Sequence, residues 1–323
     1  MSQAPNARRW LHWETMLALA LIIDLCFNAS VSPYFMDVWT WSDATFYFTE
    51  RGLIALPLAL LIIAGEIDLS VAGIIALASV AMGTAAAHGV NTPGLVAVGL
   101  ATGAAAGAIN GFLVTVCRVS SIVATIGTMS AFRGVAYAVL GDRVLKDYPA
   151  SFATLGQGYA FGAVSIELLT FVVMALLTAV LLHATRWGQS IYAMGANATV
   201  ARWSGVPIDR YRFLLFCATG TMSGLAAVML TSRLGSTRPS IAQGWELEII
   251  SIVVLGGIAV TGGKGTIGGV LLAAVLLGFV NFGLSLLNLP GLVMWIVIGT
   301  LLISVVAIPA LIERVRARRL RPA

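Results

Sequence analysis

Residues 50–88 read ERGLIALPLALLIIAGEIDLSVAGIIALASVAMGTAAAH, and this stretch decides the fold. Two apolar runs, 50–66 and 71–88, are joined by the short polar stretch Gly65-Glu66-Ile67-Asp68-Leu69-Ser70. A run of roughly 20 apolar residues has the length of a helix that crosses a bilayer. The stretch therefore predicts two membrane-spanning helices with a polar break between them.

The composition extends this prediction to the whole chain. Of its 323 residues, 59% are hydrophobic and only 10% are charged, whereas charged residues make up about a quarter of a typical soluble domain. A soluble fold of this size could not bury so much apolar surface, and a membrane barrel would show short alternating segments instead. We predict an all-α integral membrane protein with a single transmembrane domain over 1–323. About ten transmembrane helices with short loops are expected, at 15–33, 50–66, 71–88, 93–117, 121–140, 165–184, 211–232, 247–262, 267–288 and 291–310.

The positive charges predict the orientation of these helices. If the N-terminus is inside, most of the 19 lysines and arginines fall on cytoplasmic segments, as the positive-inside rule requires. An even number of spans then places both termini in the cytoplasm. The net charge of +5 is explained by this topology and does not indicate nucleic-acid binding.

Small residues recur at fixed spacing in two of the predicted spans. Gly99, Gly103, Gly107 and Gly111 stand four residues apart, and so do the pair at 265 and 269. At this spacing the glycines share one helix face and let neighbouring backbones approach closely. They predict tight helix packing.

One polar segment interrupts the apolar runs, Thr185 to Arg212 (TRWGQSIYAMGANATVARWSGVPIDRYR). Within it, Ala193 to Ser204 are expected to form a short helix that Gly205 and Pro207 end, since proline cannot continue a helix. A basic cytoplasmic loop would by itself explain the arginines. A compact helix followed by a turn favours a second interpretation, in which the segment is a docking surface that receives force from a partner.

A glycine-rich stretch, Gly263-Lys264-Gly265-Thr266-Ile267-Gly268, has the spacing of a dinucleotide fingerprint. Its context argues against that role, because a membrane-length apolar run follows and no acidic residue stands about 20 positions further on. We interpret it as a tight turn between two spans. The sequence shows no nucleophile motif, no paired-acid site and no cluster of metal ligands. It therefore predicts no catalytic residue, no metal site and no cofactor bound by this chain.

Three acids lie in or beside the apolar runs: Asp24 in the first run, and Glu66 and Asp68 in the polar break. A charge at membrane depth is costly and usually faces a cavity or a partner. The acids either relay protons or cations, or form a polar break that caps the next helix, near Ser70, and lines a pathway. The second interpretation is preferred for Glu66 and Asp68, and the choice stays open for Asp24.

Other polar side chains within the spans are few. Each of them either lines a solute pathway or bonds a neighbouring helix, which is the commoner use. The candidate pathway residues are Glu66, Asp68, Ser70, Asn110, Thr125, Thr128 and Asn281.

Four stretches together resemble the permease subunits of bacterial ATP-driven importers of the ribose and simple-sugar type. They are Gly65–Val71 (GEIDLSV), Ser121–Thr128 (SIVATIGT), Gly188–Val206, and the closing block from Trp245 to Leu284. The similarity covers nearly the whole chain, and the motifs are specific in combination. Departures from the family pattern occur at Ser121, Ala72 and Phe282.

The resemblance implies a half-pore in the bacterial inner membrane. A second permease subunit, identical or a sister chain, would complete the pore. A separate cytoplasmic ATPase would bind ATP, and a periplasmic binding protein would deliver a monosaccharide or similar small polyol. Rhamnose, ribose and autoinducer 2 are the solutes that the resemblance suggests.

Under this resemblance, residues 185–212 would form the coupling loop that the ATPase moves. The residues expected to couple to the ATPase are Ala193, Gly195, Asn197, Arg202, Ser204 and Gly205. The alternative is an ion-coupled secondary transporter that works alone through Asp24, Glu66 and Asp68.

Overall fold

The computed structural model describes residues 7–291, 293–294, 296–297, 299–300 and 303. The described chain is almost entirely helical, as predicted, apart from loops and one short antiparallel hairpin. The longer helices are α1 (Ala7–Val31), α3 (Thr49–Ile63), α4 (Val71–Ala87), α5 (Thr92–Thr115), α6 (Ser121–Leu140), α8 (Ile166–Ala184), α9 (Arg186–Ala196), α11 (Ile208–Leu234), α12 (Trp245–Leu255) and α13 (Ile267–Leu286). The short elements are α2 (Val38–Thr45), η1 (Ala150–Phe152), α7 (Ala153–Gln157), β1 (Tyr159–Phe161), β2 (Val164–Ser165) and α10 (Ala198–Trp203).

Six helices of the described chain are long and apolar enough to cross a membrane, within α1, α5, α6, α8, α11 and α13. A seventh crossing results if α2 and α3, which meet at 44°, count as one bent span. The predicted spans 50–66, 71–88 and 247–262 correspond to the shorter helices α3, α4 and α12, so the number ten stays a prediction. The last predicted span, 291–310, lies largely outside the described residues, and both termini lie wholly outside them.

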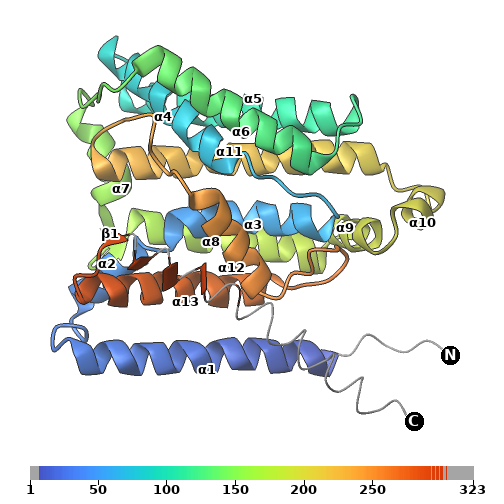
Figure 1. Cartoon of the computed structure of the whole chain (residues 1–323), viewed down its shortest axis with the longest axis horizontal. Coiled ribbons are helices and arrows are strands. Elements are labelled where there is room, and N and C mark those ends of the chain that lie inside the picture. The colour runs from blue at the N-terminus through green and yellow to red at the C-terminus, as the bar shows by residue number, and fades with distance from the viewer. Residues whose placement is uncertain (1–6, 292, 295, 298, 301–302, 304–323) are drawn as a thin grey trace.

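The long helices lie side by side with their axes in roughly the same direction (Figure 1). The short helices α9 and α10 stand at one end of this stack, and α2, α7 and β1 stand at the other (Figure 1). Helix α11 runs through the middle and packs against α5, α3, α4 and α7. We call the two ends the α9–α10 end and the hairpin end.

The glycine face predicted on α5 packs directly against α11. A Cβ atom at Gly103 would overlap the carbonyl oxygen of Gly220, and one at Gly107 would overlap that of Phe216. Glycine at these positions therefore lets the two backbones touch, as close helix packing in membranes requires. The prediction of tight packing is confirmed for the α5 glycines, and α11 is the partner. The pair at 265 and 269 was predicted wrongly as one helix face, because α13 begins only at Ile267.

Two helices, α3 and α12, end just before a glycine with a positive φ angle. After α3 ends at Ile63, the chain runs to α4 through 64–70 without regular structure, and Gly65 has a φ of +87°. The predicted span 247–262 is wrong in its second half, since α12 ends at Leu255 and Gly257 has a φ of +85°. Positive φ is cheap only for glycine, so each glycine ends a helix in mid-sequence.

Candidate functional site

The polar segment between α8 and α11 folds as two short helices. Thr185 caps α9, with its side chain accepting from the N–H of Gly188 at 3.4 Å, and Asn197 caps α10 by accepting from Val200 N–H at 3.1 Å. The single helix expected over Ala193–Ser204 is therefore wrong. Asn197 has an extended backbone, and its amide side chain starts a new helix instead of continuing the old one.

Most of the residues predicted to face a partner are exposed on this segment. Ala193, Asn197, Arg202, Ser204 and Gly205 all lie at the surface.

The segment also carries an apolar surface that the set of predicted coupling residues omitted. Trp203 is 87% exposed and Val200 is 59% exposed, both on α10. Their exposure depends on where the helix break at Asn197 falls, which the sequence did not reveal.

Gly195 differs from the other coupling residues because it faces the body of the protein. A Cβ at this position would overlap the carbonyl oxygen of Ile63 at the end of α3 and the backbone nitrogen of Gly263. The N–H of Gly263 in turn donates to Ile63 O at 2.8 Å. We call this three-way backbone contact the glycine joint.

A side chain of α9 reinforces the glycine joint. The hydroxyl of Tyr192 donates to Gly265 O at 2.6 Å, and burial raises the pKa of that hydroxyl. The turn predicted over 263–268 is present, and it lies under α9. Its glycines serve this close contact.

The predicted pathway residues, except Asn281, gather around the break between α3 and α4. Asp68 Oδ1 accepts from the N–H and the hydroxyl of Ser70 at 2.8 and 2.7 Å. Asn110 on α5 donates to Ser70 Oγ and accepts from Thr128 on α6, each at 2.7 Å. Thr125 bonds the Ser121 carbonyl of its own helix at 2.7 Å. This buried network ties the broken segment to two neighbouring helices.

The contacts of the three predicted relay acids are separate. Asp24 Oδ2 accepts from Asn28 at 3.2 Å on α1, and Glu66 forms an ion pair with Arg212 at 2.9 Å. Asp68 is held by Ser70, while its second oxygen, Oδ2, is buried without a hydrogen-bond partner in the described chain. The three acids therefore do not form one connected relay among the described residues.

Asn281 belongs to a second polar group, at the hairpin end of α3. It donates to Glu248 Oε1 at 3.0 Å, and Glu248 also forms an ion pair with Arg51 at 2.9 Å. The Arg51 guanidinium lies 4.2 Å from the ring centroid of Trp245. A cation over an indole face at this distance is attracted by the ring.

The residue next to Arg51 makes another ion pair across the bundle. Glu50 is fully buried, and its two oxygens accept from Arg233 of α11 at 2.9 and 2.8 Å. Neighbouring Thr49 donates to Glu167 at 3.2 Å. None of these ion pairs was predicted from the sequence.

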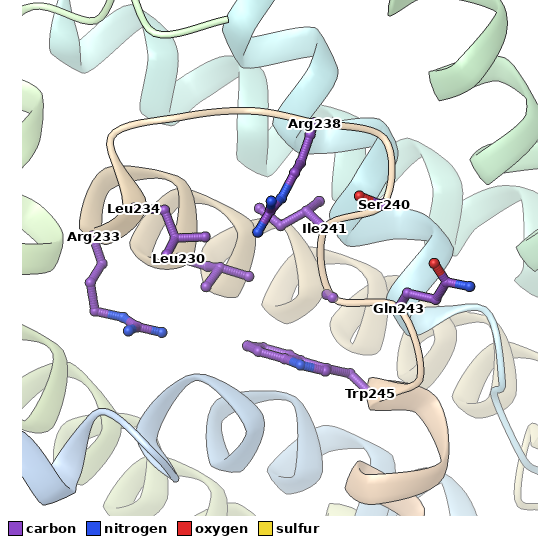
Figure 2. A pocket seen from close by; sticks show the side chains of 9 residues that line it. Leu230, Arg233, Leu234, Arg238, Ser240, Ile241, Gln243 and Trp245 are labelled. Carbon is purple, nitrogen blue, oxygen red and sulfur yellow. The ribbon is translucent and has the colours of Figure 1, made fainter. Parts of the chain in front are cut away.

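A cavity of about 480 Å³ opens beside these ion pairs, between α11, the loop 235–244 and α12. In Figure 2, Arg233 and Trp245 point toward one another beneath the loop, and Arg238 points down from the loop beside Ile241. The walls are formed by Leu230, Arg233, Leu234, Arg238, Ser240, Ile241, Ala242, Gln243 and Trp245.

The loop over the cavity is held in place by hydrogen bonds from α6. Arg133 of α6 donates to the carbonyl oxygens of Pro239 and Ile241 at 2.8 and 3.1 Å, and to that of Ala72 at 3.0 Å. Ala242 in the cavity wall has a φ of +54°, a left-handed conformation that costs a non-glycine residue about 1–2 kcal/mol.

The other anchor of this loop is Thr237. Its hydroxyl is bonded by Ser79 at 2.8 Å and by Tyr148 at 2.5 Å, and burial raises the pKa of Tyr148 to about 12. The tyrosine therefore stays a neutral hydrogen-bonding group. The loop is a fixed wall of the cavity.

A second, mostly apolar cavity of about 220 Å³ lies between α3, α8, α9 and α11. None of the predicted pathway residues lines either of these cavities of the described chain. The predicted pathway residues therefore lie at the α3–α4 break and, for Asn281, beside the Arg51–Glu248 ion pair. Both cavities lie elsewhere.

Comparisons with known proteins place these features in a family. A family model described as "Branched-chain amino acid transport system / permease component" matches residues 42–306. The "Autoinducer 2 import system permease protein LsrD" of Salmonella typhimurium (strain LT2) is 32% identical over 93% of this chain and 92% of its own.

Two further relatives carry the same printed name. The protein of Yersinia enterocolitica is 33% identical over 93% of this chain and 92% of its own, and that of Escherichia coli O9:H4 (strain HS) is 32% identical over 91% of each. No solved structure matches this chain.

Proposed function

Because the chain belongs to the family of bacterial permeases of ATP-binding-cassette import systems, we propose that it passes a small hydroxylated solute across the inner membrane while a separate ATPase supplies the energy. The family confirms the resemblance carried by the motifs. It also makes the chain a multi-pass protein of the bacterial inner membrane, consistent with its apolar helices.

The solute proposed is a monosaccharide or a similar small polyol. Relatives that match along almost their whole length are named for autoinducer 2 import, so autoinducer 2 is the first candidate, ahead of rhamnose and ribose. The partners proposed are an ATPase, a periplasmic binding protein and a second permease subunit, identical or a sister chain.

The observation that carries the energy-coupling role is the two-sided α9–α10 segment. On one side it exposes Trp203, Val200 and Arg202. On the other side Gly195 is locked against the end of α3 through backbone contacts. If a partner displaces this segment at its exposed surface, the displacement is passed directly to α3, because the contact is made by backbone atoms, which have no side-chain rotamers that could absorb it.

The proposal assigns the α9–α10 end to the cytoplasm. Ala193, Asn197, Arg202, Ser204 and Gly205 would then contact the ATPase, together with Trp203. Gly195 would transmit the movement. Asp68, Ser70, Asn110, Thr125 and Thr128 would keep the α3–α4 break in shape beside the pathway, with Glu66 held by Arg212.

Reconstitution into proteoliposomes tests the proposal. We expect uptake of labelled autoinducer 2, rhamnose or ribose only when ATP, the ATPase and the binding protein are all present. Uptake by this chain alone, driven by a proton gradient, would establish the ion-coupled alternative through Asp24, Glu66 and Asp68 in its place.

A surface variant tests the docking face separately. Trp203→Ala should weaken assembly with the ATPase and reduce ATP-driven uptake, since a large exposed aromatic is a typical anchor of a protein interface. The matched control is Trp39→Ala, which removes a 53% exposed tryptophan of α2 at the opposite end. An equal strength of assembly with the ATPase in the two variants would remove Trp203 from the interface.

A further inference from the structure

The cavity between α11, the loop 235–244 and α12 has the size and the wall chemistry of a small-molecule site. Its volume of about 480 Å³ lies within the range of about 300–1,000 Å³ found for ligand pockets. Such pockets combine apolar and aromatic walls with a few placed polar groups. Here Trp245, Leu230 and Ile241 supply the first kind, and Ser240 and Gln243 supply the second.

Two arginines at the cavity are neutralised by partners. Arg233 is paired with Glu50, and the cation that lies over Trp245, Arg51, is paired with Glu248. Arg238 is exposed and has no ion pair in the described part of the chain. The walls therefore present hydrogen-bonding groups with a single uncompensated charge, which suits a neutral solute with several hydroxyls.

The walls of the cavity are also fixed by hydrogen bonds within the protein, without any ligand. Arg133 fixes the loop through the carbonyl oxygens of Pro239 and Ile241, and Thr237 is anchored to Ser79. Ala242 keeps a left-handed backbone in the wall itself. Backbone strain of this kind persists only where its surroundings enforce it, and it gathers at ligand sites.

We propose that this cavity binds the transported solute, a neutral small polyol, with the Trp245 ring against its apolar face and Ser240, Gln243 and Arg238 bonding its hydroxyls. The proposal rests on the proposed function and gives it a place in the structure. Under this proposal the solute does not contact Asn110 and Thr128, which hydrogen-bond each other.

Protection from a thiol reagent tests this assignment in the complete transporter. The three native cysteines, Cys26, Cys117 and Cys217, are first replaced by serine. Ser240→Cys then places one thiol in the cavity, and Ser151→Cys places one on an exposed serine outside it. We expect a transported solute, tested as autoinducer 2, rhamnose and ribose, to slow the labelling of Ser240→Cys several-fold and to leave Ser151→Cys unaffected.

Uptake kinetics provide the second measurement. Gln243→Leu keeps the size of the side chain and removes its hydrogen bonds, so the KM for uptake should rise by about tenfold or more. Trp245→Ala should do the same, and Trp245→Phe should recover part of the loss, because it restores an aromatic face.

The outcomes separate this proposal from the proposed function. If wild-type transporter takes up a solute with ATP, but that solute neither protects Ser240→Cys nor requires Gln243 and Trp245, the cavity is not its binding site. If wild-type transporter takes up none of the three solutes with ATP, the proposed function itself fails.

Discussion

The two ends of α3 are built on different physical principles. At the α9–α10 end, Ile63 meets Gly195 and Gly263 through backbone atoms alone. At the hairpin end, Glu50 and Arg51 reach Arg233 and Glu248 through charged side chains. The first contact depends on steric fit between backbone atoms, and the second depends on the pairing of opposite charges.

Helix α3 joins these two contacts, and Pro57 inside it removes one backbone hydrogen bond of the helix. Its fifteen residues make it about 22 Å long at 1.5 Å per residue, and every residue except Arg51 is buried. We expect a displacement at Ile63 to reach Glu50 and Arg51, beside the cavity, because α3 is confined by buried contacts along its length. The difference predicts that the glycine joint fails sterically, whereas the ion pairs fail through uncompensated charge.

The largest effect on ATP-driven uptake is expected at the glycine joint. Gly195→Ala adds one methyl group where backbone atoms of Ile63 and Gly263 already stand, and overpacking of this kind costs about 1–3 kcal/mol. Since neither backbone can rotate away, α9 must shift, and ATP-driven uptake should be lost. Uptake and ATP hydrolysis are measured together in proteoliposomes.

The matched control for this variant is Gly127→Ala on α6. Gly127 is also helical, but an added Cβ there meets nothing within 4 Å, so uptake should stay at the wild-type level. Normal uptake by Gly195→Ala would mean that α9 does not press on α3.

A smaller effect on transport, but a clear effect on stability, is expected at the ion pairs. Glu50→Gln leaves Arg233 partly buried without its partner, and breaking a buried pair typically costs about 3–5 kcal/mol. The midpoint of thermal unfolding in detergent should fall. The midpoint of Arg233→Gln should fall by a similar amount. The double variant should lose less in midpoint than the sum of the losses of the two single variants.

An exposed arginine of the same end serves as the control. Arg143 has no ion pair in the described chain and bonds only the carbonyl of Leu140, so Arg143→Gln should unfold near the wild-type midpoint. Additive losses in the double variant would show that Glu50 and Arg233 do not interact.

This contrast also marks what the sequence could predict. Glycines repeated at helical spacing and a polar break in an apolar run are local patterns, so the α5 face and the α3–α4 break were found. Asp68, Ser70 and Asn110 were singled out because polar residues inside apolar spans are rare, and their place beside a solute pathway stays a prediction. The three residues turn out to bond one another.

The ion pairs could not be predicted, because their partners lie far apart in the chain. Glu50 and Arg233 are separated by 183 positions, and each stands near the end of a span, where charges are common. The cavity was missed for the same reason, since its walls come from the end of one helix, a loop and the start of another. The break at Asn197 was missed because asparagine is also tolerated within a helix.

A third prediction concerns the middle of the bundle, between the two ends of α3. Asn110→Ala removes one hydrogen bond of Ser70 and one of Thr128, and each lost hydrogen bond costs about 0.5–1.5 kcal/mol net. The unfolding midpoint should fall by less than for Glu50→Gln, since no charge is left unpaired. Ser130→Ala is the control, because that exposed hydroxyl bonds only its own helix, at Ile126. A loss as large as that of Glu50→Gln would mean that Asp68 also depends on the network for its charge.

The smallest effect is expected where a charge pair stands at the α9–α10 end. Arg118 forms two bonds to Asp209, at 2.7 and 3.0 Å, and this neighbour raises the pKa of the arginine. Both side chains are exposed, at 60% and 39%, so water and salt screen the pair. Arg118→Gln should therefore leave the unfolding midpoint unchanged in low and in high salt. A fall comparable to that of Asn110→Ala in low salt, absent in high salt where the pair is screened, would show that this end also depends on charge, and the contrast between the two ends of α3 would no longer hold.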